Sequence, residues 1–247
     1  MSLYKNKNLI YYGLNCKVYS IEKDNKKYVM KVLLNKNDNE LNIYSIINDL
    51  DNKYLVKFIE KIDNCLIYEF CEYNTLENLL YQIDNNKLIK IISQLVEFFI
   101  LLRDKGYYYN DLSLNNILID QNYKIKVIDY GSLYKIGNIP KDITGTYGFI
   151  SPEYLKENIL DYEKNFVFSC GVILFLLYFK FYLFKKSSDY FKKCWNWCDK
   201  SECNRNDCLS KYLDKKSIDQ TLKKILLNCL KFNHKDRITI NKLKVTC

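Results

Sequence analysis

The spacing of apolar residues changes once along this chain, near residue 74. Before that point, residues 28–34 and 66–71 form short apolar runs that are typical of buried strands. Between them, apolar residues recur at three- and four-residue intervals over residues 43–50 and predict one helix. Later, an apolar face over residues 88–102 predicts a long helix that ends before Gly106. The pattern therefore predicts an α+β protein with a small β-rich lobe followed by a larger α-rich lobe.

The α-rich part contains further recognisable segments. Residues 117–119 and 125–128 flank a polar turn and predict a hairpin, and residues 218–229 predict the last helix. Residues 166–184 form an apolar stretch, but Asn165 and Lys180 leave only 14 positions between them. A bilayer needs about 20 apolar residues. We therefore expect a buried core helix rather than a membrane span.

Composition excludes some kinds of chemistry. The chain has 247 residues and a single histidine, His234, which excludes a histidine-based triad or a histidine-rich metal centre. Its net charge of +9 suits phosphate-bearing ligands or acidic substrates, but arginine is scarce and we expect no nucleic acid partner. No apolar signal peptide begins the chain, and its ten cysteines follow no disulfide framework. We therefore expect a reduced, intracellular protein.

Carboxylates and amides supply the candidate chemistry. Asp111 and Asn116 lie in a loop between the long helix and the hairpin, and Asp129 follows the hairpin. An amide oxygen and a carboxylate converging from two loops, here Asn116 and Asp129, suit Mg²⁺. Asp111 would then be available to accept a proton from an attacking hydroxyl.

Three motifs, in order, resemble those of the eukaryotic-type protein kinases. The catalytic loop H-R-D-L-x-x-x-N corresponds to residues 109–116, and D-F-G corresponds to residues 129–131. The end of the activation segment, G-T-x-x-Y/F-x-A-P-E, corresponds to residues 145–153. The resemblance implies a bilobal fold, an ATP and Mg²⁺ requirement and a protein substrate. It implies one kinase domain over residues 1–247, with an N-lobe to about residue 70, a hinge at 71–75 and a C-lobe over 76–247.

The same resemblance assigns roles to single residues. Lys31 would neutralise the α- and β-phosphates, Glu40 would hold Lys31, and Asp111 would act on the substrate hydroxyl. Asn116 and Asp129 would hold the metal. The remaining assignments are Thr146 as a contact of the catalytic aspartate, Ile10, Gly13, Val18, Glu69 and Cys71 around ATP, Tyr68 as gatekeeper, and the ion pair Glu153–Arg237.

Taken singly, these residues have ordinary interpretations. A lysine in an apolar strand, such as Lys31, is most often a surface residue whose stem covers its neighbours. Asp129 before Gly131 is most often a turn, and Glu40 is most often a solvated helix residue. Their joint spacing with the catalytic loop is what favours the kinase interpretation.

The phosphate loop departs from the family pattern. Aligning its end with Val18 leaves Tyr11, Gly13 and Cys16 at the three glycine positions of G-x-G-x-x-G. Side chains at two of these positions should stiffen the loop, and we expect weaker nucleotide affinity.

The catalytic loop also departs from the pattern. Asn110 replaces the arginine that binds an activation-loop phosphate, so we expect activity without that phosphorylation. Ser113 replaces a lysine that contacts the transferred phosphate, and Phe166 replaces a bracing aspartate, with Asn165 as its possible stand-in. These changes leave open a second interpretation, an inactive pseudokinase that serves as a binding scaffold. Thr146, and the lack of a tyrosine-kinase arginine near Asn115, favour serine/threonine specificity.

One cysteine-rich insert, about residues 186–216, has no counterpart in the family pattern. Four thiolates could bind Zn²⁺, but the spacing lacks paired C-x-x-C knuckles, and we expect a metal-free, reduced insert that could bind a partner. The four residues are Cys194, Cys198, Cys203 and Cys208. The sequence predicts neither the protein substrate nor an oligomeric state.

Overall fold

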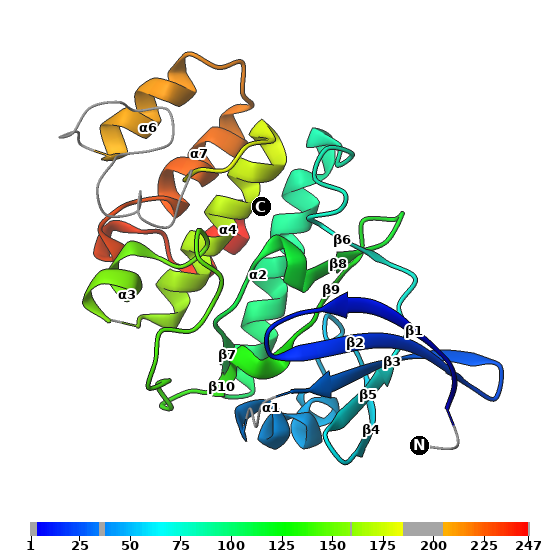
Figure 1. Ribbon diagram of the computed structural model, residues 1–247. Helices are drawn as coiled ribbons and strands as arrows, with labels where there is room; N and C mark the ends of the chain where they lie inside the picture. The colour runs from blue at the N-terminus through cyan, green and yellow to red at the C-terminus, as the bar shows by residue number, and fades with distance from the viewer. Residues whose placement is uncertain (1–3, 35–37, 159, 185–204, 247) are drawn as a thin grey trace.

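The computed structural model describes residues 4–34, 38–158, 160–184 and 205–246. A twisted antiparallel sheet with helix α1 beside it forms one end of the molecule, and a mainly helical part with several short strands forms the rest (Figure 1). The sheet has the strand order β1-β2-β3-β5-β4. Its strands are β1 (Lys5–Tyr12), β2 (Cys16–Lys23), β3 (Lys26–Leu33), β4 (Phe58–Ile62) and β5 (Cys65–Glu69). The predicted strands are present as β3 and β5, although β5 already ends at Glu69.

The prediction of a single helix over residues 43–50 is wrong. Helix α1 (Asp38–Ile43) ends where that helix was expected to begin, and two short 3₁₀ turns (Tyr44–Ile46 and Asn48–Leu50) follow it. The Asn48 side chain donates to the Phe58 carbonyl at 2.8 Å and accepts from the Phe58 N–H at 3.1 Å. These bonds tie the segment to β4 and compete with continued helix. Asp51, in the left-handed region at φ 46°, ends the segment.

The helical part is built around α2 (Leu88–Asp104) and α4 (Tyr162–Phe179), the predicted helices. Between them lie short strands that carry the loops described below. These are β7 (Tyr107–Tyr109), β8 (Ile117–Ile119), β9 (Ile125–Val127) and β10 (Leu133–Lys135), with β6 (Asn74–Thr75) pairing with β8. The helices α3 (Pro152–Glu157), α6 (Arg205–Asp214), α7 (Gln220–Cys229) and α8 (Ile240–Thr246) complete the described part. The helix expected to be last is α7, so α8 corrects that prediction.

Helix α4 is the buried core helix that the sequence predicted. By length and its mean hydropathy of 1.3 it is apolar enough to cross a membrane, but 72% of that stretch is buried inside the protein. Helix α7 and the residue after it approach α4 closely at Gly171. A Cβ atom on Gly171 would lie 2.7 Å from the Cβ of Cys229 and 2.9 Å from two side-chain atoms of Leu230. Gly171 therefore lets α7 pack directly on the α4 backbone.

The two parts of the molecule are joined by the segment just before β4. The N–H of Val127 donates to the Tyr54 carbonyl at 2.7 Å, and Lys126 Nζ donates to the Leu55 carbonyl at 2.7 Å. The Asn52 amide donates to the Phe98 carbonyl in α2 at 3.1 Å. This segment fixes the sheet to the helical part beside the loop that carries Asp129.

Gly171→Ala should lower the free energy of unfolding by about 1–3 kcal/mol, because the added methyl group overpacks the α4–α7 contact. Urea denaturation of the two proteins measures the difference. Helix propensity alone would instead make alanine more stable than glycine. An unchanged or higher unfolding free energy would therefore contradict the close packing.

Candidate active site

A buried lysine joins three elements at the inner face of the sheet. Lys31 of β3 lies 2.7 Å from Glu40 of α1 and 2.7 Å from Asp129, which follows β9. Lys31 and Glu40 are only 8% and 2% exposed. Burial alone would lower the pKa of Lys31, but the charges of Asp129 and Glu40 outweigh burial and raise it above its ordinary value. The lysine is therefore held as a cation between two carboxylates.

The catalytic loop brings together three more of the predicted residues. The Thr146 hydroxyl donates to Asp111 Oδ1 at 2.6 Å, and the Asn116 amide nitrogen donates to Asp111 Oδ2 at 2.9 Å. Burial raises the pKa of Asp111 to about 6, against the opposing effect of the bond from Thr146. Asp111 is thus a carboxylate in fixed orientation whose basicity is higher than that of an exposed aspartate.

The donor set on these loops fits Mg²⁺. Asn116 uses its amide nitrogen for Asp111, which leaves its oxygen as the atom suited to a metal. Asp129 binds Lys31 through Oδ1, and its side chain is 43% exposed. Hard cations prefer such oxygens, and Mg²⁺ commonly takes only one or two protein ligands besides phosphate and water.

Hydroxyl groups hold the backbone around Asp129, and the sequence-based assignment missed their role. Asp129 lies in the left-handed region at φ 65°, a strained conformation for a non-glycine residue. The Tyr109 hydroxyl contacts the carbonyls of Ile128 at 2.9 Å and Asp129 at 3.1 Å. The Tyr130 hydroxyl accepts from the Val56 N–H at 2.6 Å. Tyr109 stands where the catalytic-loop motif has histidine, and Tyr130 stands where D-F-G has phenylalanine. The sequence therefore already showed a hydroxyl group at each of these two motif positions.

A third missed residue, Asn39, is the neighbour of Glu40 in α1. Its amide nitrogen donates to the carbonyls of Gly131 at 2.7 Å and Leu133 at 3.0 Å. Helix α1 therefore holds the Asp129 loop through Asn39 as well as through the ion pairs of Lys31. Only its position beside Glu40 could have indicated it.

Neutral amides organise the activation segment. The Asn110 amide nitrogen donates to the Thr144 hydroxyl at 2.9 Å, and Asn110 Oδ1 accepts from the Asn165 amide at 2.8 Å. Asn165 Oδ1 in turn accepts from the Ser151 N–H at 2.8 Å. Asn165, buried at the start of α4, therefore braces both the catalytic loop and the segment before α3, in the manner expected of a stand-in for the aspartate. The backbone of Gly145 also lies close to that of Asn110. A Cβ atom on Gly145 would lie 2.8 Å from the Asn110 carbonyl oxygen.

Ser113 does not replace the lysine of the family pattern with another charge. It is 1% exposed, and its hydroxyl has no hydrogen-bond partner among the described residues. The gatekeeper candidate Tyr68 is likewise buried, and its hydroxyl has no hydrogen-bond partner within the part of the chain that the structure describes.

The predicted nucleotide residues come from the sheet and the segment that follows it. Val18 pairs with Lys31 in the β2–β3 ladder. Ile10 in β1 is 55% exposed, and Gly13 lies between β1 and β2. Glu69 ends β5, and Cys71 follows it half-buried, with its thiol pKa raised to about 11 by burial. Val18 therefore shares the Lys31 face of the sheet, and Glu69 and Cys71 lie at and just beyond the end of the neighbouring strand β5.

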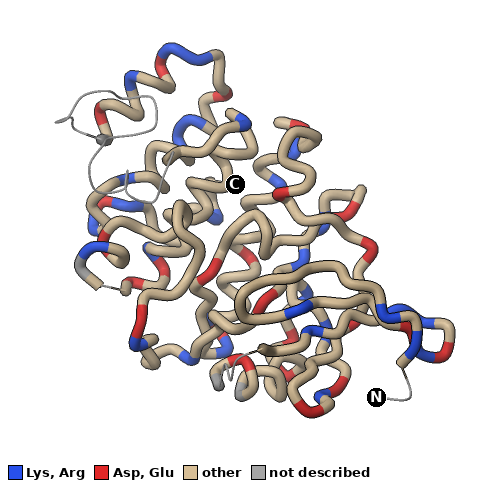
Figure 2. The backbone as a smooth tube through the Cα atoms, viewed as in Figure 1, with Lys and Arg blue, Asp and Glu red and all other residues tan. Residues whose placement is uncertain are grey.

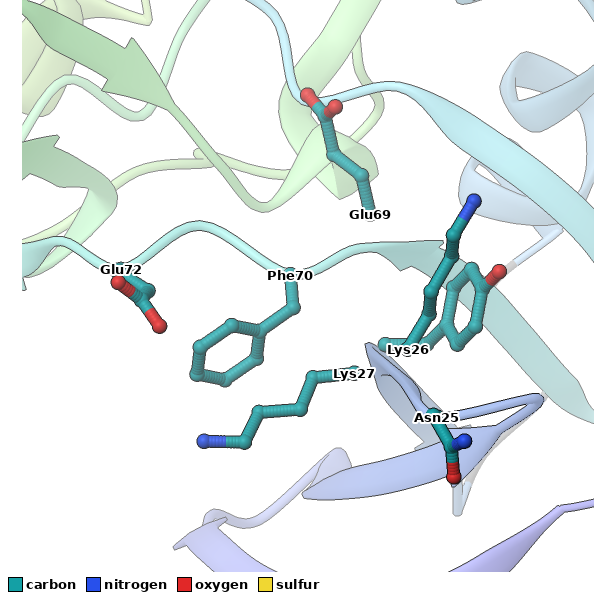
Figure 3. A pocket seen from close by; sticks show the side chains of 7 residues that line it. Asn25, Lys26, Lys27, Glu69, Phe70 and Glu72 are labelled. Carbon is teal, nitrogen blue, oxygen red and sulfur yellow. The ribbon is translucent and has the colours of Figure 1, made fainter.

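A surface pocket of about 540 Å³ lies beside this strand end rather than at the Lys31 centre. Figure 3 shows that Phe70 faces Lys27 there, and the Lys27 ammonium lies 5.5 Å from the ring centroid. Its lining residues are Asn25, Lys26, Lys27, Tyr28, Glu69, Phe70 and Glu72. Among the candidate site residues only Glu69 lines it, so the pocket is not the site of the proposed chemistry.

The predicted structural ion pair is buried in the helical part. Arg237 donates to both oxygens of Glu153 at 2.7 and 3.0 Å. Arg237 is 2% exposed and also donates to the carbonyls of Lys231 and Lys164. Burial alone would raise the pKa of Glu153, but the bonds from Arg237 hold it below its ordinary value.

The cysteine-rich insert lies mostly outside the described residues. Cys194, Cys198 and Cys203 fall there, and only Cys208, half-buried in α6, is described. The metal-free insert therefore stays a prediction.

The β-rich and α-rich parts, the buried Lys31 with its two carboxylates and the two loops together form the arrangement expected of a protein kinase domain. A family model described as "Protein kinase domain" matches residues 4–246, and the chain belongs to this family. The resemblance and the α+β fold class inferred from the sequence are thereby confirmed.

Curated relatives match about half of the chain. The receptor-like protein kinase ANXUR1 of Arabidopsis thaliana is 30% identical over 148 residues, which cover 53% of this chain and 17% of the relative. The probable serine/threonine-protein kinase CST of the same species is 33% identical over 141 residues, covering 51% and 33%. The cysteine-rich receptor-like protein kinase 6 of Oryza sativa subsp. japonica is 32% identical over 148 residues, covering 52% and 21%. The chain thus spans a third or less of the length of these three relatives.

Glu153→Gln should lower the free energy of unfolding by about 3 kcal/mol at pH 7, because it leaves the Arg237 charge buried without its counterion. The folded-state pKa of Glu153 lies below its unfolded value of about 4.3, so the pair contributes fully above that value and is lost as the pH falls through the folded pKa. Urea denaturation from pH 7 toward about pH 3.5 measures both effects.

The difference in unfolding free energy between the unaltered protein and Glu153→Gln should therefore become smaller as the pH falls. The exposed Glu72→Gln substitution is the matched control and should change little at any pH. A loss for Glu153→Gln that is no larger than this control, or that is independent of pH, would contradict the role of the pair.

Proposed function

We propose that this chain is an ATP-dependent serine/threonine protein kinase that transfers the γ-phosphate to a protein hydroxyl. The observation that carries the proposal is the set of charged groups: Lys31 bound to both Glu40 and Asp129, and Asp111 held in a fixed orientation by Thr146 and Asn116. Such a set is the minimum that phosphoryl transfer by positioning and charge neutralisation requires.

In this proposal each residue has one task. Lys31 neutralises the α- and β-phosphates, and Glu40 keeps it aimed. Asn116 and Asp129 would hold Mg²⁺, which when bound neutralises charge on the phosphates. Asp111 orients the substrate hydroxyl and accepts its proton. Ile10, Gly13 and Val18 would cover the nucleotide, and the backbone of Glu69 and Cys71 would bind the adenine.

Serine/threonine specificity is part of the proposal. It is supported by the bond from Thr146 to Asp111 and by relatives whose names include serine/threonine-protein kinase. We also propose that residues 71–75 form the hinge of a single kinase domain and that the protein acts inside a cell. Figure 2 shows basic and acidic positions interspersed over both lobes, in keeping with a protein partner rather than nucleic acid.

A scaffold without catalysis is the second candidate. Ser113 favours it, since a buried hydroxyl supplies no cation to the transferred phosphate. Loss of one such charge should lower the rate, by about 10²-fold if nothing replaces it, rather than remove the reaction.

Asp111→Ala and Lys31→Met should each reduce ATP-dependent phosphate transfer by at least about 10²-fold, because they remove the base and the phosphate-binding cation. Transfer of labelled γ-phosphate to serine/threonine peptides measures this. The exposed Asp104→Ala and Lys26→Met serve as matched controls and should keep the unaltered rate. If the unaltered protein is as inert as Asp111→Ala and Lys31→Met while binding a partner, the scaffold is the correct function.

Unphosphorylated protein should be as active as phosphorylated protein, because Asn110 carries no charge and is already bonded to Thr144 and Asn165. Phosphatase treatment, checked by mass spectrometry at Ser132, Tyr134, Thr144 and Thr146, should change the transfer rate less than about twofold. A mock-treated sample is the control. Strict dependence on phosphate at any of these four residues would contradict the role given to the neutral network.

A further inference from the structure

Two neighbouring tyrosines in β1 lie on opposite faces of the sheet. Tyr11 pairs with Val18 of β2, and Val18 pairs with Lys31 of β3. Directly opposed residues of neighbouring strands share a face, so Tyr11 lies on the face from which Lys31 reaches Glu40 and Asp129. Tyr12 pairs with Lys17, whose ammonium lies 4.9 Å from the Tyr12 ring centroid. Because side chains alternate along a strand, these two occupy the outer face.

The Tyr11 ring lies against the tip of the hairpin. A Cβ atom on Gly13 would lie 2.7 Å from both Cε1 and the hydroxyl oxygen of Tyr11. The backbone of Gly13 is not in the positive-φ region that favours glycine. The reason for a glycine at this position is therefore the space that the tyrosine ring and its hydroxyl need.

The hairpin end that carries this ring faces the charged centre. Cys16 is buried there, and it lies two residues before Val18 in β2, so it shares the face of the sheet on which Val18 pairs with Lys31. The N–H of Gly13 donates to the Cys16 carbonyl at 2.9 Å. This backbone donor is thus used inside the hairpin, whereas the Tyr11 side chain is 57% exposed.

We propose that the Tyr11 hydroxyl is the hairpin's donor to the phosphates of the bound nucleotide. It takes the part that backbone N–H groups play in a glycine-rich loop, where bare backbone approaches the phosphates. A phenol hydroxyl can donate one hydrogen bond to a phosphate oxygen, and a charged acceptor makes that bond stronger than a neutral one. The inference rests on the proposed function and adds a phosphate-binding residue to it.

The test is equilibrium binding, which needs no turnover. Titration calorimetry measures the affinity of ATP with Mg²⁺, and of adenosine, for the unaltered protein, Tyr11→Phe and Tyr12→Phe. Tyr11→Phe keeps the ring and loses only the hydroxyl, so ATP affinity should fall about tenfold while adenosine affinity stays unchanged. Tyr12→Phe makes the same chemical change on the outer face and should leave both affinities unaltered. Thermal unfolding should show all three proteins equally folded, since both side chains are exposed.

Three outcomes overturn the inference. Equal ATP affinity of Tyr11→Phe and Tyr12→Phe shows that the hydroxyl binds no phosphate, although the proposed function survives. Tighter ATP binding by Tyr11→Gly than by the unaltered protein shows that the ring obstructs the nucleotide. An unaltered protein that binds adenosine but not ATP, or neither, overturns the proposed function together with the inference.

Discussion

The rest of the structure depends on the burial of one positive charge. Lys31 is almost inaccessible to water, and it is stable as a cation only because Glu40 and Asp129 both lie 2.7 Å away. These three residues come from β3, from α1 and from the loop after β9, so their pairing fixes the sheet, the helix and the Asp129 loop relative to one another. Asn39, beside Glu40, strengthens the same connection through the backbone after Asp129. Removing either carboxylate would leave buried Lys31 with one counterion instead of two. The positions of the three residues therefore depend on one another.

Around this charged centre, the supporting bonds are neutral. Amide groups of Asn110 and Asn165 hold the catalytic loop and the activation segment, and hydroxyls of Tyr109 and Tyr130 hold the backbone around Asp129. Buried neutral bonds need no counterion and are little affected by salt. They are also complete without a covalently added phosphate. The arrangement of the site is therefore built into the folded chain.

The positions of the candidate site residues could be predicted because each lies in a short motif whose spacing fixes its place on a loop or strand. Features set by distant contacts could not. The break after α1 depends on Asn48 bonding to Phe58, ten residues away. The need for glycine at Gly171 depends on α7, almost sixty residues later. Tyr11 lies on the same face of the sheet as Lys31 because of a register shift between Leu9 and Tyr11, which apolar spacing does not reveal.

The departures from the family pattern fall into two physical groups. Those at Asn110, Tyr109 and Tyr130 exchange one hydrogen-bonding or packing group for another, and the structure shows each new group bonded. Ser113 differs, because its buried hydroxyl has no partner among the described residues and brings no charge. A missing cation weakens stabilisation of the transferred phosphate, but it does not disturb the ion pairs of Lys31. On the proposed function, the change at Ser113 would therefore slow phosphate transfer rather than abolish it.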